Sequence, residues 1–108
     1  MTAPRIIANV PAKAKPGEII AISALIGHVM ENGFRYTTTG VLRPRDIITS
    51  FVALYNGEEI FSAQFFPSVA ANPFISFHTR ATESGTIELR WTGDNGFAAS
   101  HRAKIAVE

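Results

Sequence analysis

Apolar and polar residues alternate along most of this chain with the two-residue period that is typical of half-buried β-strands. The period is cleanest over residues 86–92, where three large apolar residues are predicted to face inward: Ile87, Leu89 and Trp91. In the longest apolar run, residues 18–28, the even positions form the better apolar face: Ile20, Ile22, Ala24 and Ile26. No segment keeps a helical period over ten residues. The pattern therefore predicts an all-β protein.

Turn signals divide the chain between these runs. Asn-Gly occurs three times, at 32–33, 56–57 and 95–96, and it favours two-residue hairpins because both residues take a positive φ at low cost. The predicted strands are residues 5–10, 18–28, 47–55, 59–65, 73–82, 86–92 and 97–107. Their number and spacing predict an antiparallel immunoglobulin-like β-sandwich of about seven strands, as a single domain over residues 1–108. A small β-barrel is the alternative.

Two connections stand out as candidate binding elements. Residues 29–46 form a connection of 18 residues, where most connections have about 4–6, and connections of that length are usually binding elements or disordered. In the second, Phe65-Phe66-Pro67 and Val69-Ala70-Ala71 place apolar side chains where the core need not bury them. Exposed apolar area usually marks a partner site, and the alternative is a connection that folds back on its own core.

Composition narrows the classes of partner. The chain has 10 Lys and Arg against 9 Asp and Glu, so no global field draws it to nucleic acid or to a membrane. It has no apolar run of about 18 residues, the length that a membrane-spanning helix needs. Its start lacks the basic and apolar segments of a secretory signal, and this observation taken alone predicts a cytoplasmic protein. It has no cysteine, which excludes disulfides, thiolate metal ligands and thiol nucleophiles.

Catalytic and metal-binding patterns are missing from the sequence. The three histidines, His28, His78 and His101, fall on three predicted strands without metal-ligand spacing. Glu58 and Glu59 are adjacent, so on a strand they point to opposite faces. No nucleophile elbow or phosphate-binding glycine motif occurs. The sequence therefore predicts no enzyme, no metal and no cofactor.

Segments along the whole chain, in order and spacing, resemble the SoxZ family, the cysteine-free subunit of the SoxYZ sulfur carrier of bacterial sulfur oxidation. They are Pro4-Arg5, residues 15–20, residues 25–33, Pro44 to Ile48, residues 61–74 and residues 83–86. Residues 28–33 are similar to the family's His-Pro-Met-Glu-Thr-Gly loop, and residues 67–73 to its Pro-Ala-Ile-Ala-Ala-Asn-Pro run. Val29 replaces the usual Pro, and Ser68 replaces a common Ala.

The resemblance implies a non-catalytic role. SoxY holds sulfur intermediates on a cysteine in a flexible C-terminal arm, and this chain has no cysteine to carry them. The expected role is to pair with SoxY, as a heterodimer or heterotetramer, and to help present its arm to the pathway enzymes through transient contacts. The resemblance also implies a periplasmic location by co-export with a signal-bearing SoxY. Without SoxY, we expect that the vacant surface can drive self-association.

The predicted partner-binding residues lie in the two connections. For SoxY they are Phe65, Phe66, Pro67, Val69, Asn72 and Phe74. Near the SoxY arm or a partner enzyme, we expect His28, Met30 and Arg35. We also expect Arg35 and Arg43 to attract the anionic end of a bound intermediate. For the arginines the alternative is a solvated loop. For the whole chain, the alternative function is that of a stand-alone immunoglobulin-like protein- or ligand-binding module without a sulfur role. An enzyme is the third hypothesis.

Overall fold

The computed structural model describes residues 4–108, so the first three residues of the predicted domain lie outside it. It contains eight strands and one short 3-10 turn: β1 (Ile6–Asn9), β2 (Lys13–Ala14), β3 (Ile19–Ile26), β4 (Ile48–Tyr55), β5 (Glu58–Gln64), β6 (Phe74–Arg80), β7 (Gly85–Gly93), η1 (Asp94–Gly96) and β8 (Ala98–Val107). All seven predicted strands are confirmed, with ends that agree to within two residues. The two-residue β2 was missed. No helix in the described part is long and apolar enough to cross a membrane.

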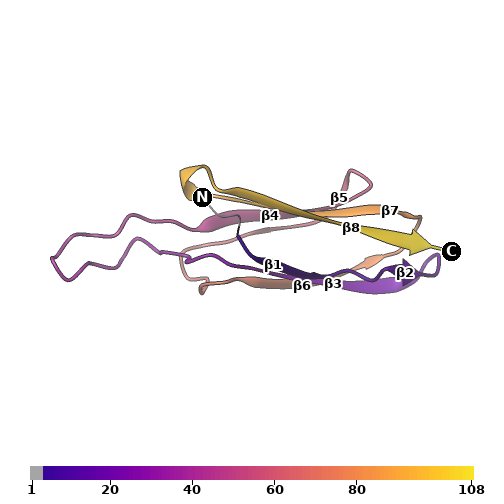
Figure 1. Ribbon diagram of the computed structural model, residues 1–108, viewed down its shortest axis with the longest axis horizontal. Helices are drawn as coiled ribbons and strands as arrows, with labels where there is room; N and C mark the ends of the chain where they lie inside the picture. The colour runs from indigo at the N-terminus through magenta and orange to yellow at the C-terminus, as the bar shows by residue number, and fades with distance from the viewer. Residues whose placement is uncertain (1–3) are drawn as a thin grey trace.

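The strands form two sheets that pack face to face (Figure 1). One sheet has the order β1-β3-β6, and the other has the order β2-β8-β7-β4-β5. Every pairing is antiparallel except β2 with β8, which is parallel. The immunoglobulin-like sandwich is thus confirmed over the barrel, since the two sheets remain separate.

The core lies between the sheets and follows the alternation of the sequence. The predicted inward positions of β3 and β7 are at most 3% exposed. Phe51 of β4 joins them, with its ring 5.2 Å from that of Trp91, and Phe61 stacks on Phe77 at 4.6 Å across the two sheets. Each fully buried side chain of this size contributes about 1.5–3 kcal/mol through removal from water.

One end of the sandwich is closed by a tyrosine. Tyr55 is 6% exposed and ends β4, just before the Asn56-Gly57 turn. Its hydroxyl accepts hydrogen bonds from the backbone N–H groups of Thr82 (3.3 Å) and Glu83 (3.2 Å), and donates one to the carbonyl of Glu83. The connection between β6 and β7 is thereby tied to β4 of the other sheet.

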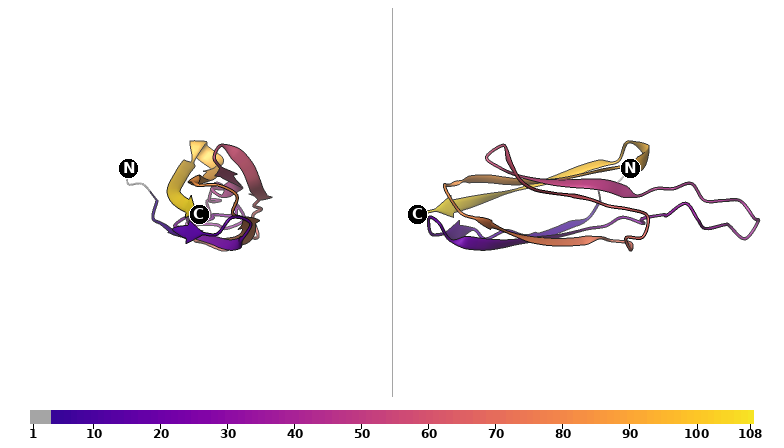
Figure 2. Two further views of the ribbon diagram at one scale, coloured as in Figure 1. Left: turned by 90° about the vertical axis from the view of Figure 1, so that its right-hand side faces the viewer. Right: turned by 180° about the vertical axis from the view of Figure 1, so that it is seen from behind.

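At the opposite end, residues 29–46 project from the sandwich as a two-stranded ribbon, here called the β3–β4 ribbon (Figures 1 and 2). Glu31 and Asp46 exchange two backbone hydrogen bonds of 2.8 Å, and Tyr36 forms an isolated bridge with Leu42. The radius of gyration is 16.3 Å, against about 13 Å for a compact domain of this length. The long connection is therefore an ordered projection that extends the molecule to 59 Å.

Candidate partner-binding surface

His28 joins the base of the ribbon to the sandwich. Its side chain is 6% exposed, and its ring lies edge-on to Phe97 with centroids 4.8 Å apart. Its backbone N–H donates to Oδ1 of Asn72, whose own N–H donates to the His28 carbonyl. Nδ1 accepts from the N–H of Met30 at 3.0 Å, so in the neutral ring the proton is on Nε2, 3.8 Å from Oδ1 of Asp46. His28 thus supports the base of the ribbon, and its role as a contact residue stays a prediction.

The returning half of the ribbon has its own anchor at Asp94. Its carboxylate accepts two hydrogen bonds from Arg45, at 2.8 and 2.9 Å, and one from the N–H of Ile47 at 3.1 Å. The bonds from Arg45 hold the pKa of Asp94 below its ordinary value. Asn95 and Gly96, predicted as a simple hairpin turn, both have positive φ but lie in η1, which presents Asp94 to Arg45.

The β3–β4 ribbon has an apolar face and a cationic face. The N–H of Arg43 donates to the carbonyl of Arg35, so Tyr36 and Leu42 form a pair without mutual backbone bonds, with side chains on one side. The two-residue alternation places Phe34 with them and places both arginines on the other side. Phe34, Tyr36 and Leu42 are 75%, 68% and 47% exposed. Nothing in the described chain covers this face.

The loop arginines differ in their partners. Arg35 binds Glu31 through two hydrogen bonds of 2.6 and 3.1 Å, which lower the pKa of Glu31 and raise that of Arg35. Arg45 is held by Asp94. Arg43 makes no hydrogen bond or ion pair through its side chain with residues 4–108. Of the two arginines predicted to attract an anion, Arg43 alone retains an unpaired guanidinium.

A shallow hollow of about 400 Å³ lies beside these arginines. It is lined by Val29, Glu31, Arg35, Arg43, Pro44, Asp46 and Asn95. The two arginines and the two carboxylates cancel in formal charge. The hollow is therefore not a strong anion site by itself.

Large exposed apolar side chains concentrate at the ribbon end of the molecule. Nine of them occur in the described part, and Ile19, the first residue of β3, alone lies at the other end. The remaining eight are Ile7, Val29, Phe34, Tyr36, Val41, Leu42, Phe66 and Phe74. On the outer face of the β1-β3-β6 sheet, Ile7 pairs with Leu25 and Leu25 pairs with Phe74, so these three side chains form one row. Exposed apolar area of this kind usually marks a partner-binding surface.

The predicted contact residues divide by exposure. Phe66 and Phe74 are 60% and 63% exposed. Phe65 and Val69 are half-buried and pack against the core, so this part of the connection folds back on the domain. The other three residues contribute less free surface. Pro67 is half-buried, and Asn72 is exposed but hydrogen-bonded to His28. Met30 is 6% exposed, and its Sδ accepts a hydrogen bond from the N–H of Ile48. As contacts with SoxY, these residues remain predictions.

Sequence reasoning missed two parts of this surface. The row that Ile7 and Leu25 form with Phe74 depends on strand register, and the apolar face of the ribbon depends on the Tyr36–Leu42 bridge. One signal was available for the row. Ile7 and Leu25 are large apolar residues at odd positions of strands whose even positions face the core.

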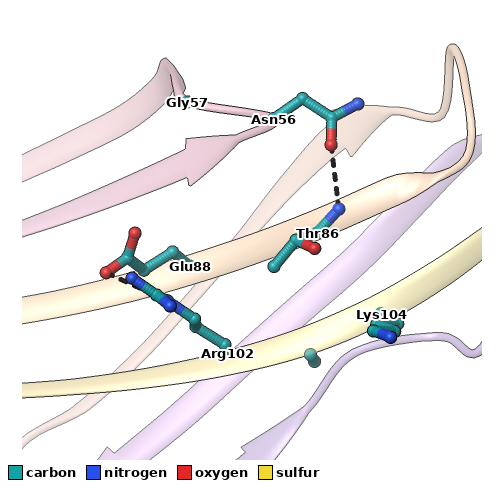
Figure 3. Close-up of a pocket in the computed structure, with 7 residues that line it drawn as sticks. Asn56, Gly57, Thr86, Glu88, Arg102 and Lys104 are labelled. Atoms are coloured by element: carbon teal, nitrogen blue, oxygen red, sulfur yellow. Dashed lines mark hydrogen bonds and ion pairs between the residues drawn. The ribbon is translucent and has the colours of Figure 1, made fainter.

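The outer face of the five-stranded sheet is charged instead. A hollow of about 640 Å³ there is lined by Asn56, Gly57, Thr86, Glu88, Arg102, Ala103 and Lys104 (Figure 3). The carboxylate of Glu88 accepts two hydrogen bonds from Arg90 and lies 3.6 Å from Arg102. The bonds from Arg90 lower the pKa of Glu88, so its carboxylate is ionised and neutralised. This arrangement is typical of a solvated sheet face.

Residues 4–108 contain no cluster of three or more His, Cys, Asp or Glu side chains that could hold a metal ion. His78 lies in β6 and His101 in β8, whereas His28, predicted on a strand, follows the end of β3.

Comparison with known proteins identifies the family. Residues 7–104 match the family of the sulphur oxidation protein SoxZ. This chain belongs to the SoxZ family. The resemblance read from the sequence is therefore confirmed, and a SoxZ-family chain has its role in sulfur oxidation. No curated protein matches the sequence.

Solved structures share the fold of this SoxZ-family chain at low sequence identity. A superoxide reductase (neelaredoxin) from Ignicoccus hospitalis is 17% identical, with a TM-score of 0.68 over 99% of this chain and 81% of its own. The sulfur carrier protein SoxY from Chlorobium limicola is 14% identical, with a TM-score of 0.64 over 100% and 81%. A putative superoxide reductase from Thermotoga maritima is 21% identical, with a TM-score of 0.64 over 97% and 85%. These similarities show the sandwich fold.

Proposed function

We propose that this SoxZ-family chain is the non-catalytic subunit of a SoxYZ sulfur carrier, which binds SoxY and helps present its cysteine-bound intermediates to the enzymes of sulfur oxidation. The observation that carries the proposal is the collection of exposed apolar side chains at the ribbon end, in a chain of this family that has no cysteine of its own. A subunit that cannot hold the sulfur can still contribute by binding the chain that does.

Three carboxyl groups of the chain have structural rather than catalytic roles. A general acid or base needs a pKa near the working pH. The three carboxyl groups whose pKa clearly departs from its ordinary value, Glu31, Glu88 and Asp94, all have it lowered, in each case first by hydrogen bonds from an arginine. These groups stay ionised at neutral pH and serve as structural ion-pair partners.

We also propose a periplasmic location, reached by co-export with SoxY, because the resemblance implies that SoxYZ carriers work there. Contacts with the pathway enzymes are expected to be brief, since a carrier must leave each enzyme after delivery. Arg43, with its unpaired guanidinium, is the residue that we expect to lie near an anionic intermediate.

The test is size exclusion with mass detection on mixtures of this chain with SoxY. We expect a stable complex of one or two copies of each chain. Phe66→Asp should weaken the complex, because it places a charge in the apolar surface, while Ile19→Asp, at a position 56% exposed at the far end, should not. Thermal melts of both variants check that each domain is folded.

Separate elution of the two wild-type chains at micromolar concentrations would contradict the proposal. The alternative function, a stand-alone immunoglobulin-like binding module, predicts that result. If Phe66→Asp instead lowers the melting temperature steeply and leaves binding by the folded fraction unchanged, Phe66 supports the fold rather than the interface.

A further inference from the structure

We infer that the β3–β4 ribbon is a clasp, whose apolar face, formed by Phe34, Tyr36 and Leu42, closes against the body of the SoxY chain. The inference rests on the proposed function and deepens it by assigning an element of this chain to the partner. It differs from the sequence prediction, which placed contacts in residues 65–74, at His28 and Met30, and at the ribbon arginines Arg35 and Arg43.

The ribbon has no second layer of its own. An isolated two-stranded ribbon is at best marginally stable in water, because it has no second layer to bury its apolar face. Here Phe34 and Tyr36 are 75% and 68% exposed while the backbone stays paired through Thr37 and Val41 (2.7 Å) and through Arg35 and Arg43 (2.8 Å). The sandwich does not supply the missing layer, as two views of the ribbon show (Figures 1 and 2). A second chain can supply it.

The ribbon also adds exposed aromatic area to its end of the molecule. The four exposed aromatic side chains at the ribbon end are Phe34, Tyr36, Phe66 and Phe74. At 60–75% exposure, they offer on the order of 500 Å² together, taking about 200 Å² for each whole side chain. A stable interface of standard size uses about 800 Å² on each partner. The aromatic residues of the sandwich provide about half of that 500 Å², so the ribbon about doubles the aromatic area available to a partner.

The charged residues of the ribbon favour a partner chain of different sequence. Of the three arginines of the ribbon, Arg35 is paired with Glu31 and Arg45 with Asp94, which leaves Arg43 unpaired. In a symmetric pair of two copies, each copy would bring the same unpaired Arg43 to the interface. A chain of different sequence can instead place acidic groups beside Arg43 and apolar groups beside Tyr36. At the same end of the molecule, the row of Ile7, Leu25 and Phe74 lies on the outer face of a sheet, a surface that suits a folded protein partner.

The experiment measures the Kd for purified SoxY by calorimetric titration. Tyr36→Ser and Leu42→Ser remove side chains from the apolar face, and each should raise the Kd about tenfold or more. Val41→Ser, on the other face of the same ribbon, and Ile19→Ser, at the far end, are matched controls that should change it less than about threefold. All four positions are exposed, so the melting temperatures of the free variants should stay together.

Each outcome of the titrations leads to a different conclusion. Tight binding of SoxY by both face variants overturns the clasp and leaves the proposed function standing. Equal weakening by Val41→Ser and Leu42→Ser overturns the one-sided face. If SoxY binding is unchanged while the face variants lose self-association or binding to anionic lipid vesicles, the occupant is wrong. If the wild-type chain itself does not bind SoxY, the proposed function fails and the clasp fails with it.

Discussion

Replacing Tyr55 by Phe tests how the end of the sandwich opposite the ribbon is held together. The substitution keeps the ring, which is 6% exposed, and removes only the hydroxyl. That hydroxyl accepts from the N–H groups of Thr82 and Glu83 and donates to the carbonyl of Glu83, so one atom serves three backbone groups. The variant leaves all three without their protein partner at a partly buried site.

The magnitude follows from these three bonds. An unsatisfied buried N–H costs about 1–3 kcal/mol, and a typical net hydrogen bond contributes about 0.5–1.5 kcal/mol. Taking the low end for a partly buried site, Tyr55→Phe should destabilise the fold by about 2–3 kcal/mol. The unfolding entropy of a chain of this length is about 0.23 kcal/mol/K, so the melting temperature should fall by about 9–13 °C.

The second tyrosine provides the matched control. Tyr36 is 68% exposed, and its hydroxyl makes no hydrogen bond with the described residues, so Tyr36→Phe should shift the midpoint by less than about 2 °C. Both variants are compared with the wild type by thermal melts followed by circular dichroism, and by urea titration. A fall of less than about 3 °C for Tyr55→Phe, or equal shifts for both variants, would refute the assignment of the three bonds.

Two further predictions concern the base of the ribbon. A Cβ at Gly93 would lie 2.4 Å from the carbonyl oxygen of Ile47, so Gly93→Ala should cost about 1–3 kcal/mol in urea titrations, whereas Gly27→Ala, whose Cβ has 3.6 Å of clearance, should be nearly neutral. Equal stabilities would show that the backbone at Gly93 can give way. Because Arg45 lowers the pKa of Asp94, their ion pair stabilises the fold above the ordinary Asp value of 3.8, and that contribution is lost as the pH falls through the lower folded-state value. Asp94→Asn should therefore reduce stability at neutral pH and flatten its loss below about pH 4, and parallel urea-midpoint profiles would contradict this.

The sequence predicted the strands well because alternation is a local property. The buried even positions of β3 and the inward face of β7 follow directly from residue order. The strand β2 has two residues and pairs in parallel with the end of β8, so it has no period that could reveal it. The fold class was predictable because the long strands show this alternation, and β2 was not predictable because it is too short to show it.

The candidate surface was less predictable, because it depends on contacts between distant residues. The turn at Asn95-Gly96 was predicted from its two residues alone. Its geometry, however, positions Asp94 for the hydrogen bond from Arg45, which is 49 residues away in the sequence. Phe65 and Phe66 are neighbours with the same side chain, and only the fold shows that the first packs on the core while the second is exposed. Strand pairing, which the sequence did not determine, sets the row of Ile7, Leu25 and Phe74.

The two anchors at the ribbon base also have a mechanical consequence. From Glu31 to the turn at residues 37–40 the extended chain covers roughly 23 Å, at about 3.3 Å per residue. A lever of that length converts a tilt of about 10° at its pivot into a tip displacement of about 4 Å, which is more than a side-chain contact tolerates. The bonds at His28 and Asp94 therefore determine how accurately the tip is aimed, and loosening either one should broaden the range of positions that the tip samples without changing any residue on it.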